Sequence, residues 1–189
     1  MVKKALRYVQ GTKGLMLTYR RSDTLEIEGY SDADFAGDID DQKSTFGYVF
    51  TLVGGAMSWK SSKQSVTASS TMYAEFVACY EASGQVEWLK KFIPGLRVVD
   101  SIQRPLRMYC DNKPAVFYAH NNKSRGVAKH IDIKFYVVKE KIQDHSITLV
   151  HISTKKMLAD PLTKGLLPSV FSEHIAGMGF KGKPVISGE

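Results

Sequence analysis

Short stretches of the chain alternate between apolar and polar residues with a period of two. Leu25–Gly29 shows this alternation, Thr45–Leu52 is rich in residues that favour strands, and Ala56–Lys60 follows the turn sequence Val53-Gly54-Gly55. A period of two is typical of β-strands, and glycines between two such stretches favour a hairpin. These stretches predict an antiparallel meander, which is followed by a polar loop at 61–65.

Longer stretches have the period of an amphipathic helix. The most extended one runs from Met72 to Ile93, follows a capping serine, Ser69 or Ser70, and ends at Pro94-Gly95. Further elements are predicted at 106–110 (strand), 130–143 (helix), 146–152 (strand) and 170–178 (helix).

The first 24 residues differ from the rest of the chain. A partial apolar stripe over Val2–Leu17 predicts a helix that Gly11 and Gly14 interrupt, and the polar, basic residues 18–24 form a linker. An isolated helix this short is marginal in water, so we expect the segment to be poorly tied down. We therefore divide the chain into residues 1–24, a domain at 25–167, and a C-terminal helix with a loose tail at 168–189.

The composition is that of a single globular domain with an excess of positive charge. The chain has 189 residues, of which 43% are hydrophobic and 24% charged, and its formal net charge is +7. Excess Lys and Arg favours a polyanionic partner, with nucleic acid first, although many basic proteins bind none. Cys79 and Cys110 are the only cysteines and lie among apolar residues, which argues against a zinc site or a disulfide framework. No apolar run is long enough to span a membrane and no signal-peptide pattern opens the chain, so we expect an intracellular, soluble protein.

Carboxylates stand at the ends of two predicted strands. Asp32 and Asp34 follow 25–29, and Asp111 follows 106–110. Ligands bind near the carboxyl ends of strands in α/β sheets, and two like charges at close range are costly to ionise unless a cation is near. This placement favours a metal site. The alternatives are a solvated acidic turn for Asp32 and Asp34, and a helix cap for Asp111.

Two further carboxylates extend the candidate site. Glu75 lies one residue from Phe76, at the edge of the buried stripe of its helix, where a carboxylate is rarely present for solubility. The alternative is that Glu75 reaches out to solvent. Asp160 opens a late segment. Two divalent cations that act on one phosphodiester need several carboxylates around them, and Mg2+ prefers hard oxygen ligands.

Seven segments around these carboxylates form a recognisable set. They are Gly29–Asp38, Lys43–Tyr48, Ser58–Lys60, Ser69–Phe76, Asp111–Asn112, Lys129–Asp132 and Ala159–Lys164. Taken in this order, they closely resemble the ribonuclease H domain of copia-type retrotransposon polyproteins. Each segment alone is weak, but the set covers most of the chain and is highly specific. The family often has Trp at the position of Phe35, a change that keeps an aromatic ring.

The resemblance implies a fold, an activity and a metal site. The fold is α/β and ribonuclease H-like, with a five-stranded mixed sheet (an antiparallel meander plus parallel strands) flanked by helices. The activity is endonucleolytic hydrolysis of the RNA strand of an RNA–DNA hybrid, with two Mg2+ ions for which Mn2+ substitutes. The implied catalytic and metal-binding residues are Asp32, Glu75, Asp111 and Asp160.

The resemblance also implies partners. Residues 1–24 resemble the end of the preceding reverse transcriptase, so the reverse transcriptase portion of the parent polyprotein is an expected partner. The isolated domain is expected to be a monomer that contacts no membrane. Its expected location is the cytoplasm, within a virus-like particle, or the nucleus. Candidate contacts to the hybrid are Lys60, Lys63, Ser69, Ser70, Asn112, Lys123, Arg125 and Lys129.

Two other functions compete with a ribonuclease. A remnant that binds nucleic acid or a polymerase without cutting would suit a chain that lacks the polymerase's catalytic part, although the intact carboxylates argue against it. Another nuclease or recombinase of the same fold fits segments 43–48 and 159–164 less well.

Cellular ribonucleases H also carry a mobile catalytic histidine before the last acid. His151 is the only candidate here, and its place at a strand end favours an ordinary surface residue.

Overall fold

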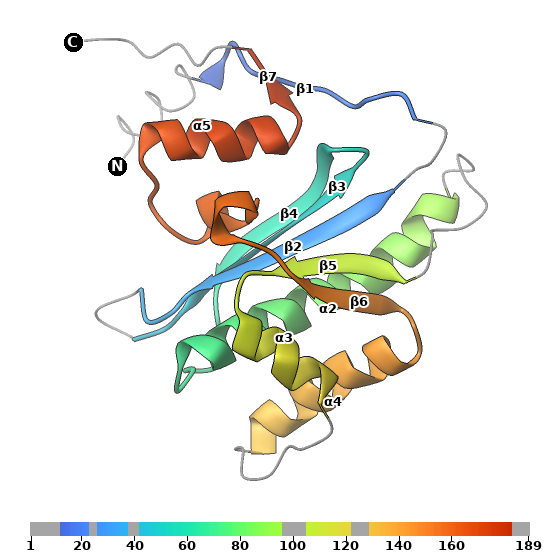
Figure 1. The fold of residues 1–189 in the computed structure, drawn as a ribbon, viewed down its shortest axis with the longest axis vertical. Helices are drawn as coiled ribbons and strands as arrows, with labels where there is room; N and C mark the ends of the chain where they lie inside the picture. Colours follow the sequence, from blue (N-terminus) through green and yellow to red (C-terminus); the bar gives the residue numbers. More distant parts are fainter. Residues whose placement is uncertain (1–11, 23–25, 38–41, 96–104, 122–128, 183–189) are drawn as a thin grey trace.

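The centre of the molecule is a five-stranded mixed sheet (Figure 1). The computed structural model describes residues 12–22, 26–37, 42–95, 105–121 and 129–182. The strands of this sheet are β2 (Ile27–Asp34), β3 (Thr45–Leu52), β4 (Gly55–Lys63), β5 (Leu106–Cys110) and β6 (Ile147–His151). Their order is β4-β3-β2-β5-β6; β3 pairs antiparallel with β2 and β4, and β5 pairs parallel with β2 and β6. The α/β fold expected from the sequence is confirmed.

Two strands are longer than the sequence predicted. β2 does not end at Gly29 but continues through Asp34, so Asp32 lies inside the strand rather than in a turn after it. The predicted loop at 61–65 is also wrong in its first part, because β4 continues to Lys63. In both cases polar residues occupy strand positions, so a prediction that follows apolar alternation ends the strand too early.

Helices cover both faces of the sheet (Figure 1). The larger hydrophobic core lies between the sheet and α2 (Thr71–Gly95), α3 (Lys113–His120) and α4 (Lys129–Gln143). A smaller core lies on the other face, where α5 (Pro168–Gly177) is found. Helix α2 is capped by Ser70, whose hydroxyl accepts a hydrogen bond from a backbone N–H of the first turn at 3.3 Å. None of the described helices combines the length and the apolar character needed to cross a bilayer.

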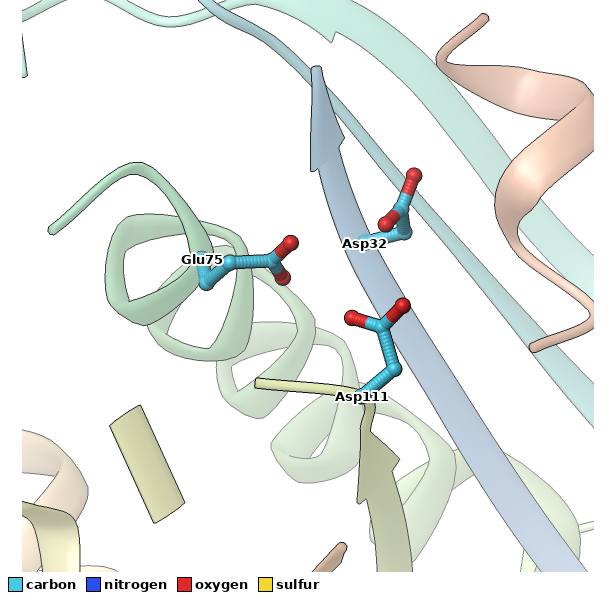
Figure 2. Close-up of side chains that lie close together, drawn as sticks. All are labelled: Asp32, Glu75 and Asp111. Carbon is cyan, nitrogen blue, oxygen red and sulfur yellow. The ribbon is translucent and has the colours of Figure 1, made fainter. Parts of the chain in front are cut away.

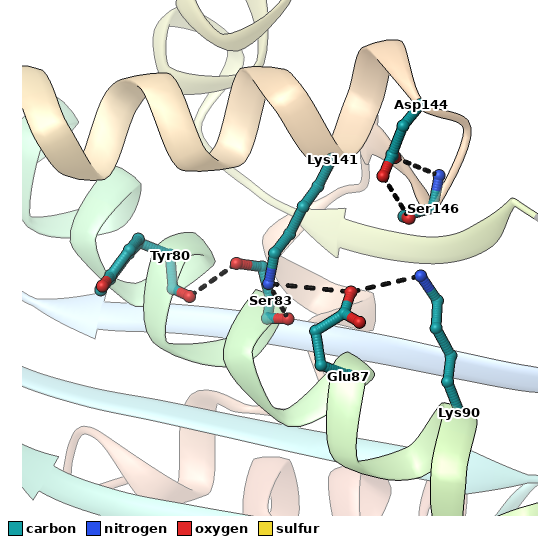
Figure 3. A network of polar contacts seen from close by, with 7 residues as sticks. All are labelled: Tyr80, Ser83, Glu87, Lys90, Lys141, Asp144 and Ser146. Carbon is teal, nitrogen blue, oxygen red and sulfur yellow. Dashed lines mark hydrogen bonds and ion pairs between the residues drawn. The ribbon is translucent and has the colours of Figure 1, made fainter.

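Polar contacts also join α4 to α2 (Figure 3). Lys141 of α4 donates a hydrogen bond to the backbone carbonyl of Ser83 at 2.7 Å, and its ammonium lies 4.0 Å from a carboxylate oxygen of Glu87. The same oxygen of Glu87 pairs with Lys90 at 3.2 Å. These contacts hold α4 against the middle of the long helix, which carries Glu75 nearer its start.

Residues 12–22 are attached to the other end of the chain. β1 (Met16–Leu17) pairs antiparallel with β7 (Phe180–Lys181) in a small second sheet. The side chains of Leu17 and Phe180 pack against the smaller core. Further hydrogen bonds run from Thr18 N and Oγ1 to the Gly179 carbonyl (2.9 and 2.8 Å) and from the Tyr19 hydroxyl to the Ala56 carbonyl (2.7 Å).

The expectation of a poorly tied-down N-terminal segment is therefore wrong for residues 12–22. Their apolar side chains pack on the domain itself, because the C-terminal strand β7 offers an edge with which they pair. Most of the predicted helix at 2–17 lies outside the described residues, as do parts of the linker and the tail at 183–189. The boundaries at 24/25 and 167/168 stay a prediction.

Candidate active site

Three carboxylates meet at one edge of the sheet (Figure 2). Asp32 projects from β2, Asp111 follows β5, and Glu75 comes from the second turn of α2. Each offers a carboxylate oxygen, and these three oxygens all lie within 4.8 Å of one another. The side chains converge because β2 and β5 are parallel neighbours, whose carboxyl ends share an edge of the sheet, and because α2 packs on β2.

Asp160 lies beside this cluster and is linked to it through Asp32. It opens a short 3-10 helix (Asp160–Leu162) and is 3% exposed. The ammonium of Lys164 lies 3.1 Å from Asp160 Oδ1 and 3.5 Å from Asp32 Oδ1. The hydroxyl of Thr163 donates a hydrogen bond to Asp32 Oδ2 and lies 3.1 Å from the Asp160 carbonyl oxygen. The site is thus a triad of acids with a fourth acid joined to it by a lysine.

Burial opposes the simultaneous ionisation of these acids. Burial and the charges of Asp32 and Asp111 raise the pKa of Glu75 to about 10. Burial and the charge of Asp32 raise the pKa of Asp160 to about 6. Burial also raises the pKa of Asp32, which the hydrogen bond from Thr163 and the charge of Lys164 counteract. Holding Asp32, Glu75 and Asp160 as carboxylates at the same time therefore requires further positive charge at the site.

The donor set fits divalent cations. Asp32 Oδ1 and Asp160 Oδ1 are buried, and the contact that balances their charge is the ion pair that each makes with Lys164. Carboxylate oxygens are hard ligands of the kind that Mg2+ and Mn2+ prefer. The oxygens of Asp32, Glu75 and Asp111 lie close enough together to hold one ion.

The competing interpretations of these acids do not fit the structure. Asp32 is fully buried, which excludes a solvated turn, and Glu75 is 4% exposed, which excludes a side chain that reaches solvent. Helix α3 is capped by Asn112, whose Oδ1 accepts a backbone hydrogen bond at 2.9 Å, so Asp111 is not the cap. Asp34 is half-buried in β2 and is not a member of the acid cluster found among the described residues.

The candidate contacts to nucleic acid are placed only in part. Lys63 ends β4 opposite Thr45, which in turn pairs with Asp34, so Lys63 lies at the same edge of the sheet as the acids. Lys60 and Ser69 are exposed. Of the others, Ser70 and Asn112 cap helices, and Lys123, Arg125 and the side chain of Lys129 lie outside the described residues.

The sequence did not single out the residues that hold the acids in place. Thr154 Oγ1 donates a hydrogen bond to Asp111 Oδ2 at 2.8 Å, and Thr163 and Lys164 contact the other two aspartates. The spacing of four residues between the last acid and Lys164 is the signal that was available, since such pairs lie close in a helical turn. His151 is exposed, and its Nε2 lies 3.2 Å from the Asp111 carbonyl oxygen.

Solved structures share this fold. LC11-RNase H1, solved in complex with an RNA/DNA hybrid, matches with a TM-score of 0.53 and 16% sequence identity over 73% of this chain and 94% of that chain. A second structure of LC11-RNase H1, isolated from compost, matches with a TM-score of 0.53 and 21% identity over 74% of this chain and 94% of that chain. The chain has a ribonuclease H fold.

Proteins of similar sequence include polyproteins of transposons. The chain is 41% identical over 163 residues to the retrovirus-related Pol polyprotein from transposon TNT 1-94 of Nicotiana tabacum, and 33% identical over 183 residues to that from transposon RE1 of Arabidopsis thaliana. These matches cover 86% and 97% of this chain but 12% of each polyprotein. No model of a protein family matches the chain. The chain is thus similar to retrovirus-related Pol polyproteins of transposons, in agreement with its resemblance to copia-type elements, and it spans about 12% of their length.

Proposed function

We propose that this chain is a ribonuclease H that hydrolyses the RNA strand of RNA–DNA hybrids during reverse transcription by its parent element. The observation that carries the proposal is the convergence of Asp32, Glu75 and Asp111 from β2, α2 and β5. The support from similarity is the shared fold with LC11-RNase H1, which was solved with an RNA/DNA hybrid. The reverse transcriptase portion of the polyprotein is the proposed protein partner.

The proposed reaction is a phosphodiester hydrolysis assisted by two divalent cations, Mg2+ or Mn2+. When bound, such cations activate the attacking water and stabilise the charge that develops at the phosphate and the leaving oxygen. The residues that would hold them are Asp32, Glu75 and Asp111 for one ion, and Asp32 with Asp160 for the other. Thr154 keeps the Asp111 carboxylate in place through its hydrogen bond to Oδ2.

The proposed substrate contacts surround this edge of the sheet. Lys63 lies at this edge, Lys60 and Ser69 are exposed, and the chain carries a net charge of +7. A basic surface holds the phosphates, and selection of a hybrid requires contacts to 2′-hydroxyl groups on one strand. Residues 123–129 add the proposed contacts Lys123, Arg125 and Lys129.

A cleavage assay tests the proposal. A hybrid labelled on its RNA strand is incubated with the protein and Mg2+, beside duplex DNA and duplex RNA of the same sequence, and only the hybrid should be cut. Asp32→Asn should lower the rate by about 100-fold or more, since even the outer partners of metal ligands are worth about 10–100-fold. Asp111→Asn should do the same. Asp34→Asn is the matched control, because Asp34 lies on the same strand outside the acid cluster.

The outcomes separate the proposed function from its rival. Equal losses for the variants at Asp32 and Asp34 would show that the site is wrongly assigned. A wild-type protein that binds the hybrid in a filter or gel assay but leaves it intact with Mg2+ and with Mn2+ would be a nucleic-acid-binding domain that no longer cuts.

A further inference from the structure

One cation of the chain itself stands between two of the site's acids. The ammonium of Lys164 lies 3.1 Å from Asp160 Oδ1 and 3.5 Å from Asp32 Oδ1. Both oxygens are buried from solvent. The lysine therefore contacts the oxygens that a second divalent cation would use.

The backbone that carries Lys164 is held firmly against the sheet. Its N–H donates to the Asp160 carbonyl at 3.2 Å, in the turn that follows the short 3-10 helix. The Ser61 hydroxyl of β4 donates to the Leu162 carbonyl, and Gly47 of β3 leaves no room between the strand and Leu162. The base of the lysine is thus fixed, and the position of its ammonium depends on the flexible four-carbon side chain.

The side chain has a route away from the acids. It is 33% exposed, whereas the side chains of Asp32 and Asp160 are 1% and 4% exposed. The two aspartates cannot follow it into solvent, but the ammonium can leave them by rotation of the lysine side chain. Removing the lysine charge without a replacement would leave two buried carboxylates close to Asp111, which is unfavourable.

We propose that Lys164 is a resident counter-cation, which holds Asp32 and Asp160 in the metal-free protein and competes with the second divalent ion for them. The inference rests on the proposed function, since it concerns the ions of that site. Its consequence is that the two ions bind with unequal affinity. The ion at Asp32, Glu75 and Asp111 shares one of its three ligands with the lysine, whereas the ion at Asp32 and Asp160 shares both and binds only after the lysine has moved. Lys164 is thereby a positioning residue, which sets the occupancy of the second position.

A Mn2+ titration of the full chain without nucleic acid, followed by electron paramagnetic resonance, tests this competition. The wild type should show a tighter and a weaker ion. Because a neighbouring opposite charge shifts the ionisation of an acid by about one to three pKa units, Lys164→Met should tighten the weaker ion by about tenfold or more. Lys91→Met removes the same charge from an exposed position near the other end of α2 and should leave both affinities unchanged. An unchanged or weaker second ion in Lys164→Met would overturn the proposal, as would a wild type that binds no Mn2+.

A second measurement uses the wild-type protein, so it does not depend on the folding of the variant. Lysine labelled with 13C at Cε gives a resonance for Lys164, which is assigned by its loss in Lys164→Arg. Saturating Mg2+ should move this resonance to the position of an exposed lysine, and no movement would contradict the displacement. Neither experiment involves cleavage. A protein that fails to cut the hybrid but shows both effects would refute the proposed function and leave this inference standing.

Discussion

At the scale of single residues, Glu75 is a buried carboxyl group whose charged form is unfavourable in the folded protein. It is 4% exposed, on the helix face that packs against the sheet, with Asp32 and Asp111 beside it. Burial and these two charges raise its pKa to about 10, so the metal-free protein holds Glu75 as a neutral acid at pH 7. Burying such a group does not stabilise the fold. Its position is instead suited to binding a cation, which would stabilise the carboxylate form.

The pH dependence of stability follows from this shift. The carboxyl of Glu75 has an ordinary value of 4.5 and a folded pKa of about 10. Between these values the folded state binds more protons than the unfolded state, so the free energy of unfolding falls as the pH rises. Glu75→Gln mimics the neutral acid and should lose less stability. In EDTA the Tm of Glu75→Gln should be higher than that of the wild type, and the difference should grow from pH 5 to pH 9. Each kcal/mol of difference in the free energy of unfolding corresponds to about 2–4 °C in Tm.

Differential scanning calorimetry at pH 5, 7 and 9 measures this effect. Glu140→Gln, at an exposed position of α4, controls for the removal of a carboxylate elsewhere. Curves of Tm against pH that run parallel for the wild type and Glu75→Gln would show that Glu75 does not titrate in this range.

The acids could be found from the sequence, whereas their supporting residues could not. Asp111 follows a recognisable apolar strand, and Glu75 interrupts the stripe of a recognisable helix, so local patterns pointed to both. Thr163 and Lys164 acquire their role through contact with Asp32, which lies 131 residues before Thr163. No local pattern contains a contact of that range. These contacts exist only because the fold brings β2 and the turn at 163–164 next to each other.

At the scale of elements, the site depends on how closely the 3-10 helix at Asp160–Leu162 approaches β3. A Cβ atom at Gly47 would lie 2.7 Å from Leu162 Cβ and 2.9 Å from Thr163 Cγ2. Gly47 pairs with Asp32 in the register of β2 and β3, so the close approach occurs directly beside the acid. Segments 43–48 and 159–164, which are far apart in the sequence, are therefore in direct contact in the fold.

Gly47→Ala should push the late turn away from the sheet. We expect a loss of about 1–3 kcal/mol of stability, as for overpacking of a well-packed contact, together with a loss of hybrid cleavage from the displacement of Asp160. Thermal unfolding and the hybrid assay measure the two effects. The matched control is Gly84→Ala in α2, where an added Cβ would meet nothing within 4 Å and a better helix former should be neutral or stabilising. A Gly47→Ala protein with wild-type stability and activity would show that the turn adjusts freely.

At the scale of the whole molecule, the two ends of the described chain form one structural unit. β1 and β7 pair, and Leu15 and Phe180 line an apolar cavity of about 340 Å³ together with Trp59 and residues of α5. The sequence predicted a separate N-terminal segment, because a partial apolar stripe there is broken by two glycines and followed by a basic linker. It could not show that a two-residue strand at the far end of the chain supplies the partner.

Two truncations measure what residues 12–22 contribute. Deletion of residues 1–22 should lower stability by about 1–3 kcal/mol relative to deletion of residues 1–11, since a partly buried leucine and the hydrogen bonds of Thr18 and Tyr19 are lost. The shorter deletion is the reference, so the difference between the two Tm values isolates the described segment. Equal Tm values would restore the original expectation of a loosely attached arm.

The pairing of β1 with β7 also determines how the molecule bears mechanical load. Met16 lies opposite Lys181 and Leu17 opposite Phe180, so a pull through residues 12 and 182 acts at one end of this ladder and opens its pairs one after another. Such unzipping needs little force, because the bonds break in sequence instead of together. The small sheet thus yields first under tension, and slack is released before the load reaches β2. A chain pulled through these two residues would lengthen at the small sheet while Asp32 on the central strand keeps its position.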